Sequence, residues 1–145
     1  MENLLIRRLG AGDADDISRI QKAITKQPGT IDYHAVVEAE AKKEDRVSFV
    51  AELDGKVVGY MITYIVYGGF GLGKSGWVGL FGVDPKYMGR GIGRMLAREV
   101  LGVLRKAGIR NVFTSVKWDS TDLLSFFKSL GFGRCDFINL EKIID

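Results

Sequence analysis

The sequence predicts an α+β domain in which helices flank a mixed, mostly antiparallel central sheet. Helix and strand candidates follow one another in the order β, α, α, β, β, β, α, β, α, β. The dipeptide Asp54-Gly55 is the strongest turn signal in the chain, so the strands on its two sides should pair as an antiparallel hairpin. No repeat, linker or low-complexity tract interrupts this order, which favours one compact domain over residues 1–145.

The N-terminal part should contain one strand and two helices. Residues 4–9 are a short apolar-rich strand candidate, and Asp13 can cap the helix that follows. Isoleucines at helical spacing predict that helix over residues 13–24. Pro28 and the glycine after it should end this helix. A second helix is expected over residues 32–43, with valines and alanines inward and charges outward.

Three strands are expected in the middle of the chain. Residues 47–53 and 57–67 form the hairpin, and residues 77–83 alternate as a further strand after a glycine-rich loop at 68–73. Glycines inside that last strand indicate a bulge or a close approach of the backbone to another group.

The C-terminal part begins with the longest helix. Residues 92–107 carry apolar side chains on one helical face, and Gly108 suits the position just after the helix end. A strand over 111–116, a helix over 121–130 and a final strand or strand pair over 132–142 complete the expected order.

Composition describes an ordinary soluble protein. Hydrophobic residues make up 46% and charged residues 27%, and the net charge of +3 is spread along the chain, so nucleic-acid binding is not required. The mild positive bias suits a small polyanionic ligand. The single cysteine, Cys135, and the single histidine exclude an internal disulfide and a Cys/His zinc cluster, so we expect no metal. With neither a signal segment nor a membrane span apparent, we expect a cytoplasmic location without membrane association.

One glycine motif satisfies the phosphate-loop pattern GxxxxGK[ST]. It spans residues 68–75 and includes Lys74. In a true phosphate loop a helix begins at the Lys-Ser pair, but residues 76–83 contain three glycines and alternate like a strand. The sequence therefore favours a mobile hairpin loop over a nucleotide site.

A second glycine motif lies at the entrance of the long helix, over residues 83–94. Its glycines leave room for backbone N–H groups of the first helical turn to meet an anion such as pyrophosphate: Gly89, Gly91 and Gly93. Three arginines at i, i+4 spacing should share one helical face and extend the positive charge: Arg90, Arg94 and Arg98. A glycine-rich helix entrance with a solvated arginine face is the alternative.

These segments resemble the GNAT superfamily of acetyltransferases. Its signature [Q/R]-x-x-G-x-[G/A] after a strand matches residues 88–93 except at Met88. Residues 120–132 resemble the family pattern N-x-x-A-x-x-F-Y-x-x-x-G-F, and the Leu-Gly-Phe ending fits well. The opening strand and the Asp54-Gly55 hairpin also fit, so the resemblance covers nearly the whole chain.

The resemblance implies a single GNAT fold with a splayed strand pair that binds acetyl-CoA. Backbone groups of Phe81 and Val83 would pair with the pantetheine arm, and the glycine motif would hold the pyrophosphate. Ser120 stands where an Asn commonly touches pantetheine, although it or Asp119 could instead cap the next helix. The implied cofactor-binding set is Phe81, Gly82, Val83, Met88, Gly89, Arg90, Gly91, Ile92, Gly93, Arg94, Ser120 and Phe127.

Both usual catalytic positions of the family carry other residues. Phe127 stands where many members have the tyrosine that protonates the leaving thiolate, and Ser115 stands where some have a glutamate base. Tyr33 and His34 lie in a region that lines the acceptor groove in the family, and an imidazole suits proton transfer near neutral pH. Further candidates remain open beside a solvent-relayed proton path: Tyr60, Tyr64, Tyr67, Glu52 and Asp119.

The resulting hypothesis is an acetyl-CoA-dependent N-acetyltransferase that moves an acyl group to a primary amine by direct attack. The acceptor could be a small molecule, a peptide N-terminus or a protein lysine, and neither residues 26–33 nor residues 68–73 carry an acidic cluster that would select one. The alternatives are a non-catalytic acyl-CoA-binding sensor or interaction module and a nucleotidase that requires Lys74. We expect a monomer or a homodimer.

Overall fold

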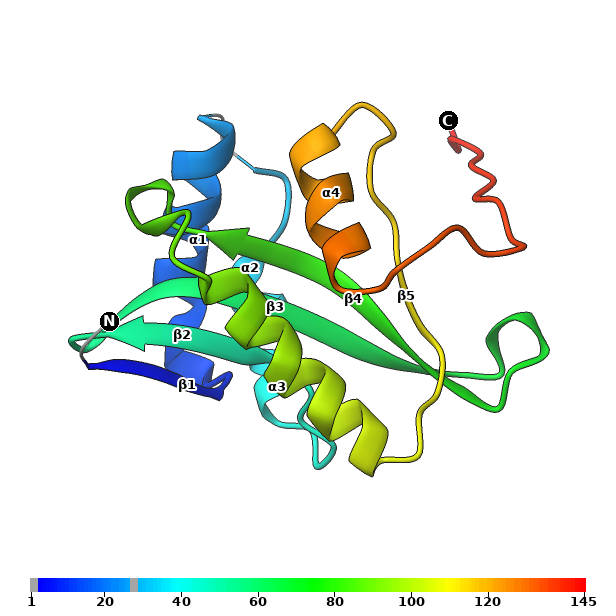
Figure 1. The fold of residues 1–145 in the computed structure, drawn as a ribbon, viewed down its shortest axis with the longest axis horizontal. Coiled ribbons are helices and arrows are strands. Elements are labelled where there is room, and N and C mark those ends of the chain that lie inside the picture. Colours follow the sequence, from blue (N-terminus) through cyan, green and yellow to red (C-terminus); the bar gives the residue numbers. More distant parts are fainter. Residues whose placement is uncertain (1–2, 27–28) are drawn as a thin grey trace. The chain divides into compact units, whose positions relative to one another are not determined.

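The structure of the chain is a computed structural model, and it describes residues 3–26 and 29–145 (Figure 1). It comprises two compact units, Met1–Ser115 and Val116–Asp145, which are described separately. The expected helix stop at Pro28 lies outside the described residues.

The first unit is a five-stranded sheet with helices on both faces. Its strands are β1 (Leu4–Arg8), β2 (Phe49–Leu53), β3 (Lys56–Tyr67), β4 (Lys74–Val83) and β5 (Val112–Thr114). Its α-helices are α1 (Ala14–Thr25), α2 (Tyr33–Ala41) and α3 (Ile92–Lys106), with short 3₁₀ turns η1 (Ala11–Asp13), η2 (Gly69–Gly71) and η3 (Pro85–Tyr87).

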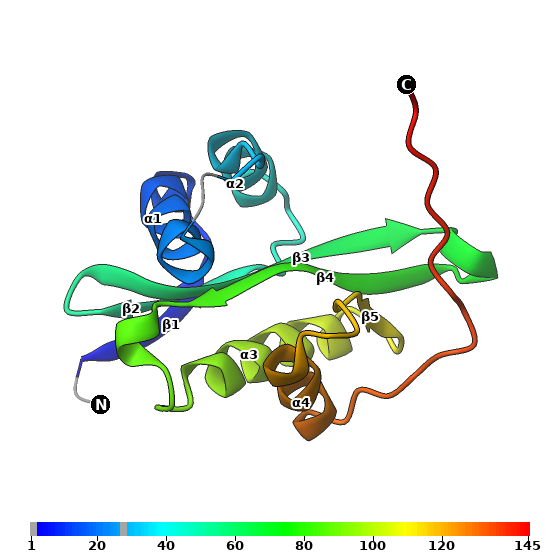
Figure 2. The same cartoon turned by 90° about the horizontal axis from the view of Figure 1, so that it is seen from above.

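The sheet is mixed and mostly antiparallel, as predicted. Its strands lie in the order β1-β2-β3-β4-β5, with antiparallel pairing throughout except for the parallel pair β4–β5. Figure 2 shows α1 and α2 on one face of the sheet and α3 on the other. The β2–β3 hairpin turns at Asp54 and Gly55, whose φ angles of 51° and 83° are both left-handed, as a tight hairpin turn of this kind requires.

Each face of the sheet has its own apolar packing. On the α1 and α2 face, Ile17, Val37 and Tyr60 belong to one buried cluster. On the other face, α3 lies so close to β3 that a Cβ at Gly59 would be 3.0 Å from Cγ2 of Ile92 and 3.3 Å from Cδ1 of Leu96. Gly59 therefore allows the close approach of α3.

Strand β4 pairs with β5 over only part of its own length. The pairing runs from Gly76↔Val112 to Val78↔Thr114, whereas β4 continues to Val83 along β3. The register between β3 and β4 also shifts, which leaves Gly79 as the additional residue of a bulge. The splayed strand pair and the glycine bulge expected from the sequence are both present.

Asp13 does not cap α1 with its side chain, contrary to the prediction. Asp13 occupies the N-cap position, but its carboxylate turns back to accept from Gly10 N at 2.7 Å. The same carboxylate pairs with the Arg7 guanidinium at 2.8 Å. A charged, two-pronged partner on β1 outweighs a single cap hydrogen bond.

The second unit contains α4 (Thr121–Ser129), as expected, but no final strand. Residues 132–142 have neither helix nor strand structure, and several apolar side chains of the C-terminal segment are exposed, among them Ile138 and Leu140. The prediction of a last strand was wrong because a segment forms a strand only when a neighbouring strand accepts its backbone hydrogen bonds.

Candidate cofactor site

The last residues of β4 lie beyond the part of the strand that pairs with β5. Some of their backbone groups face the side of β4 on which β5 lies. Asp84 N donates to Val58 O on β3 over 2.8 Å. Because alternate residues of a strand bond to opposite neighbours, Phe81 and Val83 direct their polar backbone groups away from β3. These two residues are the ones that the resemblance to the GNAT superfamily implies as contacts of the pantetheine arm.

Gly82 has no side chain because Tyr60 fills that space. A Cβ at Gly82 would lie 2.8 Å from Oη of Tyr60 and 2.9 Å from two of its ring carbons. Tyr60 is fully buried and donates to Oε1 of Gln21 in α1 over 3.0 Å. Burial and the neighbouring Tyr33 raise the pKa of Tyr60, so it stays a neutral donor. Strand β4 thus packs on a tyrosine that is hydrogen-bonded to α1.

The loop between β4 and α3 needs two left-handed glycines. Gly89 and Gly91 have φ angles of 78° and 81°, which side chains other than glycine rarely adopt. A Cβ at either position would meet no heavy atom of the described residues within 4 Å. Their role is therefore conformational, while Met88 before them is exposed and leaves the loop accessible.

The N-terminus of α3 is suited to bind an anion. Gly91 is its N-cap, and Met95 N donates to Gly91 O over 3.1 Å. The N–H groups of Ile92 and Gly93 therefore lie before the first donor of a helical hydrogen bond. By helix geometry they have no acceptor within the helix, and the helix dipole adds positive charge there. The first turn contains no carboxylate of its own that would compete with a ligand.

The three arginines do not share one helical face, contrary to the expectation from their spacing. Helix α3 begins at Ile92, so Arg90 lies in the loop, where its guanidinium is 5.3 Å from the centre of the Tyr87 ring. Arg94 and Arg98 are on α3 and exposed. The cationic groups therefore come from the loop and the helix together.

Asp84 anchors the start of this loop and was not singled out from the sequence. Asp84 is only 3% exposed, and its carboxylate accepts from Lys86 N over 3.0 Å, which fixes η3. Arg19 of α1 donates to the other carboxylate oxygen over 3.0 Å. No local pattern reveals this pair, because 65 residues separate its partners.

The charge of Asp84 is retained in the folded protein. Burial alone would raise the pKa of Asp84, but the Lys86 N–H and the Arg19 guanidinium outweigh it and hold that pKa below its ordinary value of 3.8. The carboxylate therefore stabilises the fold above that ordinary pKa and loses this contribution as the pH falls through the lowered value.

The two catalytic candidates at the start of α2 point in different directions. Tyr33 is 5% exposed and belongs to the buried cluster, where its hydroxyl has no hydrogen-bond partner among the described residues. Burial raises its pKa, and the nearby Tyr60 hydroxyl offsets part of that shift. The His34 side chain is 71% exposed, and its Nε2 lies 2.9 Å from Oδ1 of Asp15 on α1. The structure therefore places only His34 in contact with solvent.

The positions that usually supply acid and base have no such groups. Ser115 follows β5, and Phe127 lies in α4, where its ring packs edge-on against Phe126 and Phe132 with centroids 5.2 Å apart in both pairs. Ser120 is the N-cap of α4 but makes no cap hydrogen bond through its side chain, so the interpretation that Ser120 caps this helix was wrong. Its ψ of 76° departs from the extended backbone that normally aims a cap side chain at the helix.

The tyrosines of β3 line the sheet as expected. Tyr60 and Tyr64 both pack on the α1 and α2 face, and the Tyr64 ring covers Gly79, where a Cβ would collide with it. Burial, with the charge of Glu40 in second place, raises the pKa of Tyr64. Tyr67 is exposed at the end of the strand.

The loop at residues 68–73 is a strand connection and not a phosphate loop. It joins β3 to β4, and β4 begins at Lys74, so a strand stands where a nucleotide site needs a helix. The Lys74 ammonium lies 5.6 Å from the centre of the Tyr67 ring. The prediction that a strand and not a helix follows this loop is confirmed.

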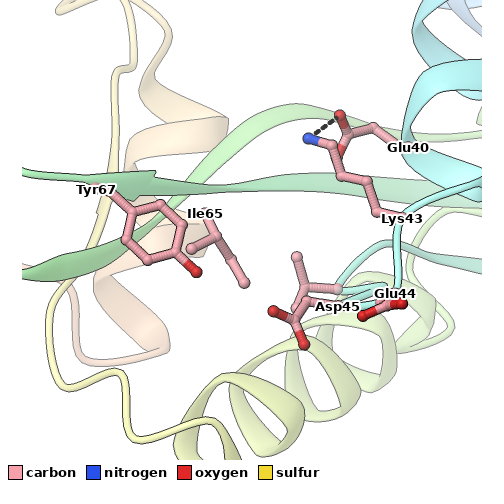
Figure 3. A pocket seen from close by; sticks show the side chains of 7 residues that line it. Glu40, Lys43, Glu44, Asp45, Ile65 and Tyr67 are labelled. Carbon is pink, nitrogen blue, oxygen red and sulfur yellow. Dashed lines mark ion pairs between the residues drawn. The ribbon is translucent and has the colours of Figure 1, made fainter.

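A separate cavity of about 360 Å³ lies beside the end of β3 (Figure 3). Its lining includes three carboxylates and one ammonium group. The residues that line it are Glu40, Lys43, Glu44, Asp45, Val47, Ile65 and Tyr67. Lys43 pairs with the buried Glu40 over 2.7 Å. Sequence reasoning missed this acidic region, although the density of acidic residues between 38 and 45 was a visible signal. No group of three potential ligands arranged to hold a metal ion occurs in the part of the chain that the structure describes.

Comparison with known proteins decides the family. The sequence model described as Acetyltransferase (GNAT) family matches residues 14–132. The chain belongs to the GNAT family. This match spans β4, the glycine motif and α4, and it confirms the resemblance found in the sequence.

Relatives with curated descriptions are acetyltransferases. A mycothiol acetyltransferase of Amycolatopsis mediterranei is 36% identical over 89 residues, which are 59% of this chain and 30% of that protein. An N-alpha-acetyltransferase of Sulfurisphaera tokodaii is 29% identical over 88% of this chain and 78% of its own length. The matched region thus spans about a third of the first of these GNAT relatives and most of the second.

Solved structures share the fold. An aminoglycoside acetyltransferase from an uncultured soil metagenomic sample, in complex with trehalose, has a TM-score of 0.81 at 19% identity, covering 99% of this chain and 97% of that one. Aminoglycoside N-acetyltransferase AAC(6')-Iy in complex with CoA has a TM-score of 0.79 at 17% identity, covering 97% and 94%. At these identities the GNAT fold is what is shared. That one domain extends over residues 1–145 remains a prediction. Among the described residues, no helix is long and apolar enough to cross a membrane.

Proposed function

We propose that this GNAT protein transfers an acetyl group from acetyl-CoA to a primary amine by direct attack. The observation that carries the proposal is the N-terminus of α3, which combines two left-handed glycines, N–H groups ahead of the first helical bond and no carboxylate in its first turn. Pyrophosphate fits this arrangement, because backbone donors and the helix dipole both favour an anion there. The pantetheine arm would then run along β4 past Gly82 and Phe81.

The chemistry follows from the thioester. The neutral amine nitrogen attacks the carbonyl carbon, a C–N bond forms as the C–S bond breaks, the sulfur leaves as a thiolate and takes up a proton, and the nitrogen loses one. Holding the two reactants side by side supplies much of the acceleration. With Phe127 and Ser115 at the usual positions, we propose that the thiolate takes its proton from solvent.

His34 is the proposed base for the amine proton. It is the only histidine in the chain, its ring is exposed, and Asp15 holds Nε2 at 2.9 Å. We propose a packing role for Tyr33, since its hydroxyl is enclosed in the core. His34→Gln should lower kcat/KM for the amine about 100-fold, while the Kd for acetyl-CoA stays unchanged.

The test compares pH–rate profiles of the wild type, His34→Gln and Asp15→Asn. The Asp15 variant keeps a side chain of the same shape without charge and should show a smaller loss. If His34→Gln retains activity within about twofold, solvent accepts the proton and His34 is not the base.

The acceptor should be sought first among free α-amino groups. The N-alpha-acetyltransferase of S. tokodaii aligns with 88% of this chain, more than the mycothiol acetyltransferase of A. mediterranei does. A screen should compare one peptide with a free N-terminus against the same peptide with a blocked N-terminus and a free lysine, beside small amines. We further propose a cytoplasmic location, because the exposed thiol of Cys135 suits a reducing compartment.

A further inference from the structure

Arg19 lies in the middle of α1 yet binds two segments outside that helix. Nη2 donates to Val57 O at the start of β3 over 2.8 Å, and Nη1 donates to Oδ2 of Asp84 over 3.0 Å. Nε lies 3.5 Å from Oδ1 of Asp16, one turn earlier, a contact that helps to orient the guanidinium. A planar guanidinium can hold such a fork, whereas an ammonium group cannot reproduce its geometry.

The contacts continue from Asp84 into the glycine loop. Its second carboxylate oxygen accepts from Lys86 N over 3.0 Å, and its own C=O accepts from Tyr87 N over 2.8 Å. These bonds form η3, which leads through Met88 directly to Gly89 and the N-terminus of α3. The position of the loop is therefore tied to a helix on the opposite face of the sheet from α3.

Asp84 depends on Arg19 because it is almost completely buried. A buried carboxylate that loses its ionic partner either keeps an uncompensated charge or takes up a proton. Both outcomes weaken the hydrogen bond from Lys86 N to the Asp84 carboxylate, which fixes η3, and the loop that follows η3 would shift. The exposed Lys56 adds only a more distant electrostatic contribution.

We infer that Arg19 is a positioning residue for the cofactor, which sets the phosphate-binding loop through Asp84 without touching the ligand. The inference rests on the proposed acetyl-CoA binding. Its effect is confined to the pyrophosphate end, because the pantetheine arm would contact β4, whose pairing with β3 does not pass through Arg19.

Arg19→Gln should raise the Kd and the KM for acetyl-CoA about tenfold and leave kcat at saturation within about twofold. S-acetylpantetheine, which lacks the pyrophosphate, should be used with unchanged kcat/KM. A purely structural defect would reduce both reactions alike. Arg19→Lys should recover part of the affinity, and Asp84→Asn should weaken binding by a similar factor without adding to Arg19→Gln.

Arg7→Gln is the matched control. Arg7 also forms two ion pairs from a partly exposed side chain, to Asp13 and Glu52, and neither partner belongs to the segment 84–91. It should lower the melting temperature and leave the Kd for acetyl-CoA unchanged. An Arg19→Gln variant with wild-type Kd, or one that loses S-acetylpantetheine turnover equally, overturns the inference. Absence of acetyl-CoA binding by the wild type would instead overturn the proposed function.

Discussion

Replacing Gly91 by valine should raise the Kd for acetyl-CoA at least about 100-fold. Gly91 has a φ of 81° and is the N-cap of α3. A β-branched residue in that conformation costs about 1–3 kcal/mol, so the loop would relax to another shape. The N–H groups of the first helical turn would then no longer converge on one anion. Isothermal titration with acetyl-CoA measures the change.

Gly102→Ala is the control for the Gly91 variant. Gly102 lies in the same helix with open space around its Cα, and alanine there should raise helix stability by up to about 1 kcal/mol without any change in Kd. A Gly91→Val protein that melts near the wild-type temperature and binds acetyl-CoA normally would show that the loop does not hold the pyrophosphate.

Gly82→Ala should destabilise the protein by about 1–3 kcal/mol, and the melting temperature should fall by roughly 2–4 °C for each kcal/mol. The new methyl group would lie within 2.9 Å of the Tyr60 ring, which is fully buried and cannot move into solvent. Because the displaced strand is the proposed cofactor strand, the KM for acetyl-CoA should rise as well. Chemical denaturation and steady-state kinetics give the two values.

The cause can be separated by a second substitution. In a Tyr60→Leu background the collision is absent, so Gly82→Ala should cost less than about 0.5 kcal/mol there. Gly73→Ala, in the loop just before β4 and with open space around it, should be close to neutral. Equal losses with and without Tyr60 would contradict the packing explanation.

Local patterns in the sequence were sufficient for most of the fold. The Asp54-Gly55 hairpin, the long helix ending before Gly108 and the strand with glycines at 79 and 82 depend on neighbours within a few residues, and the structure contains all three. The structure of the loop that we propose to bind pyrophosphate was also predictable, since strand, glycines and helix N-terminus follow one another directly in the sequence.

Features that depend on distant partners were missed or mistaken. Asp13 is a residue type that often caps helices, but its carboxylate pairs with Arg7 on β1 and does not bond to the N-terminus of α1. The Arg19–Asp84 pair joins residues far apart in the chain, and no pattern in either segment reveals it. Residues 132–142 were expected to form a strand, yet strand formation depends on a neighbouring strand that local sequence does not specify.

The central claim, that the loop from Gly89 to α3 holds acetyl-CoA, is tested most directly by titrating the purified protein with acetyl-CoA and separately with ATP. Wild type and Lys74→Ala should bind acetyl-CoA with the same Kd, and ATP should produce no saturable heat, because Lys74 begins a strand. Saturable ATP binding that Lys74→Ala abolishes, together with no binding of acetyl-CoA, would contradict the account.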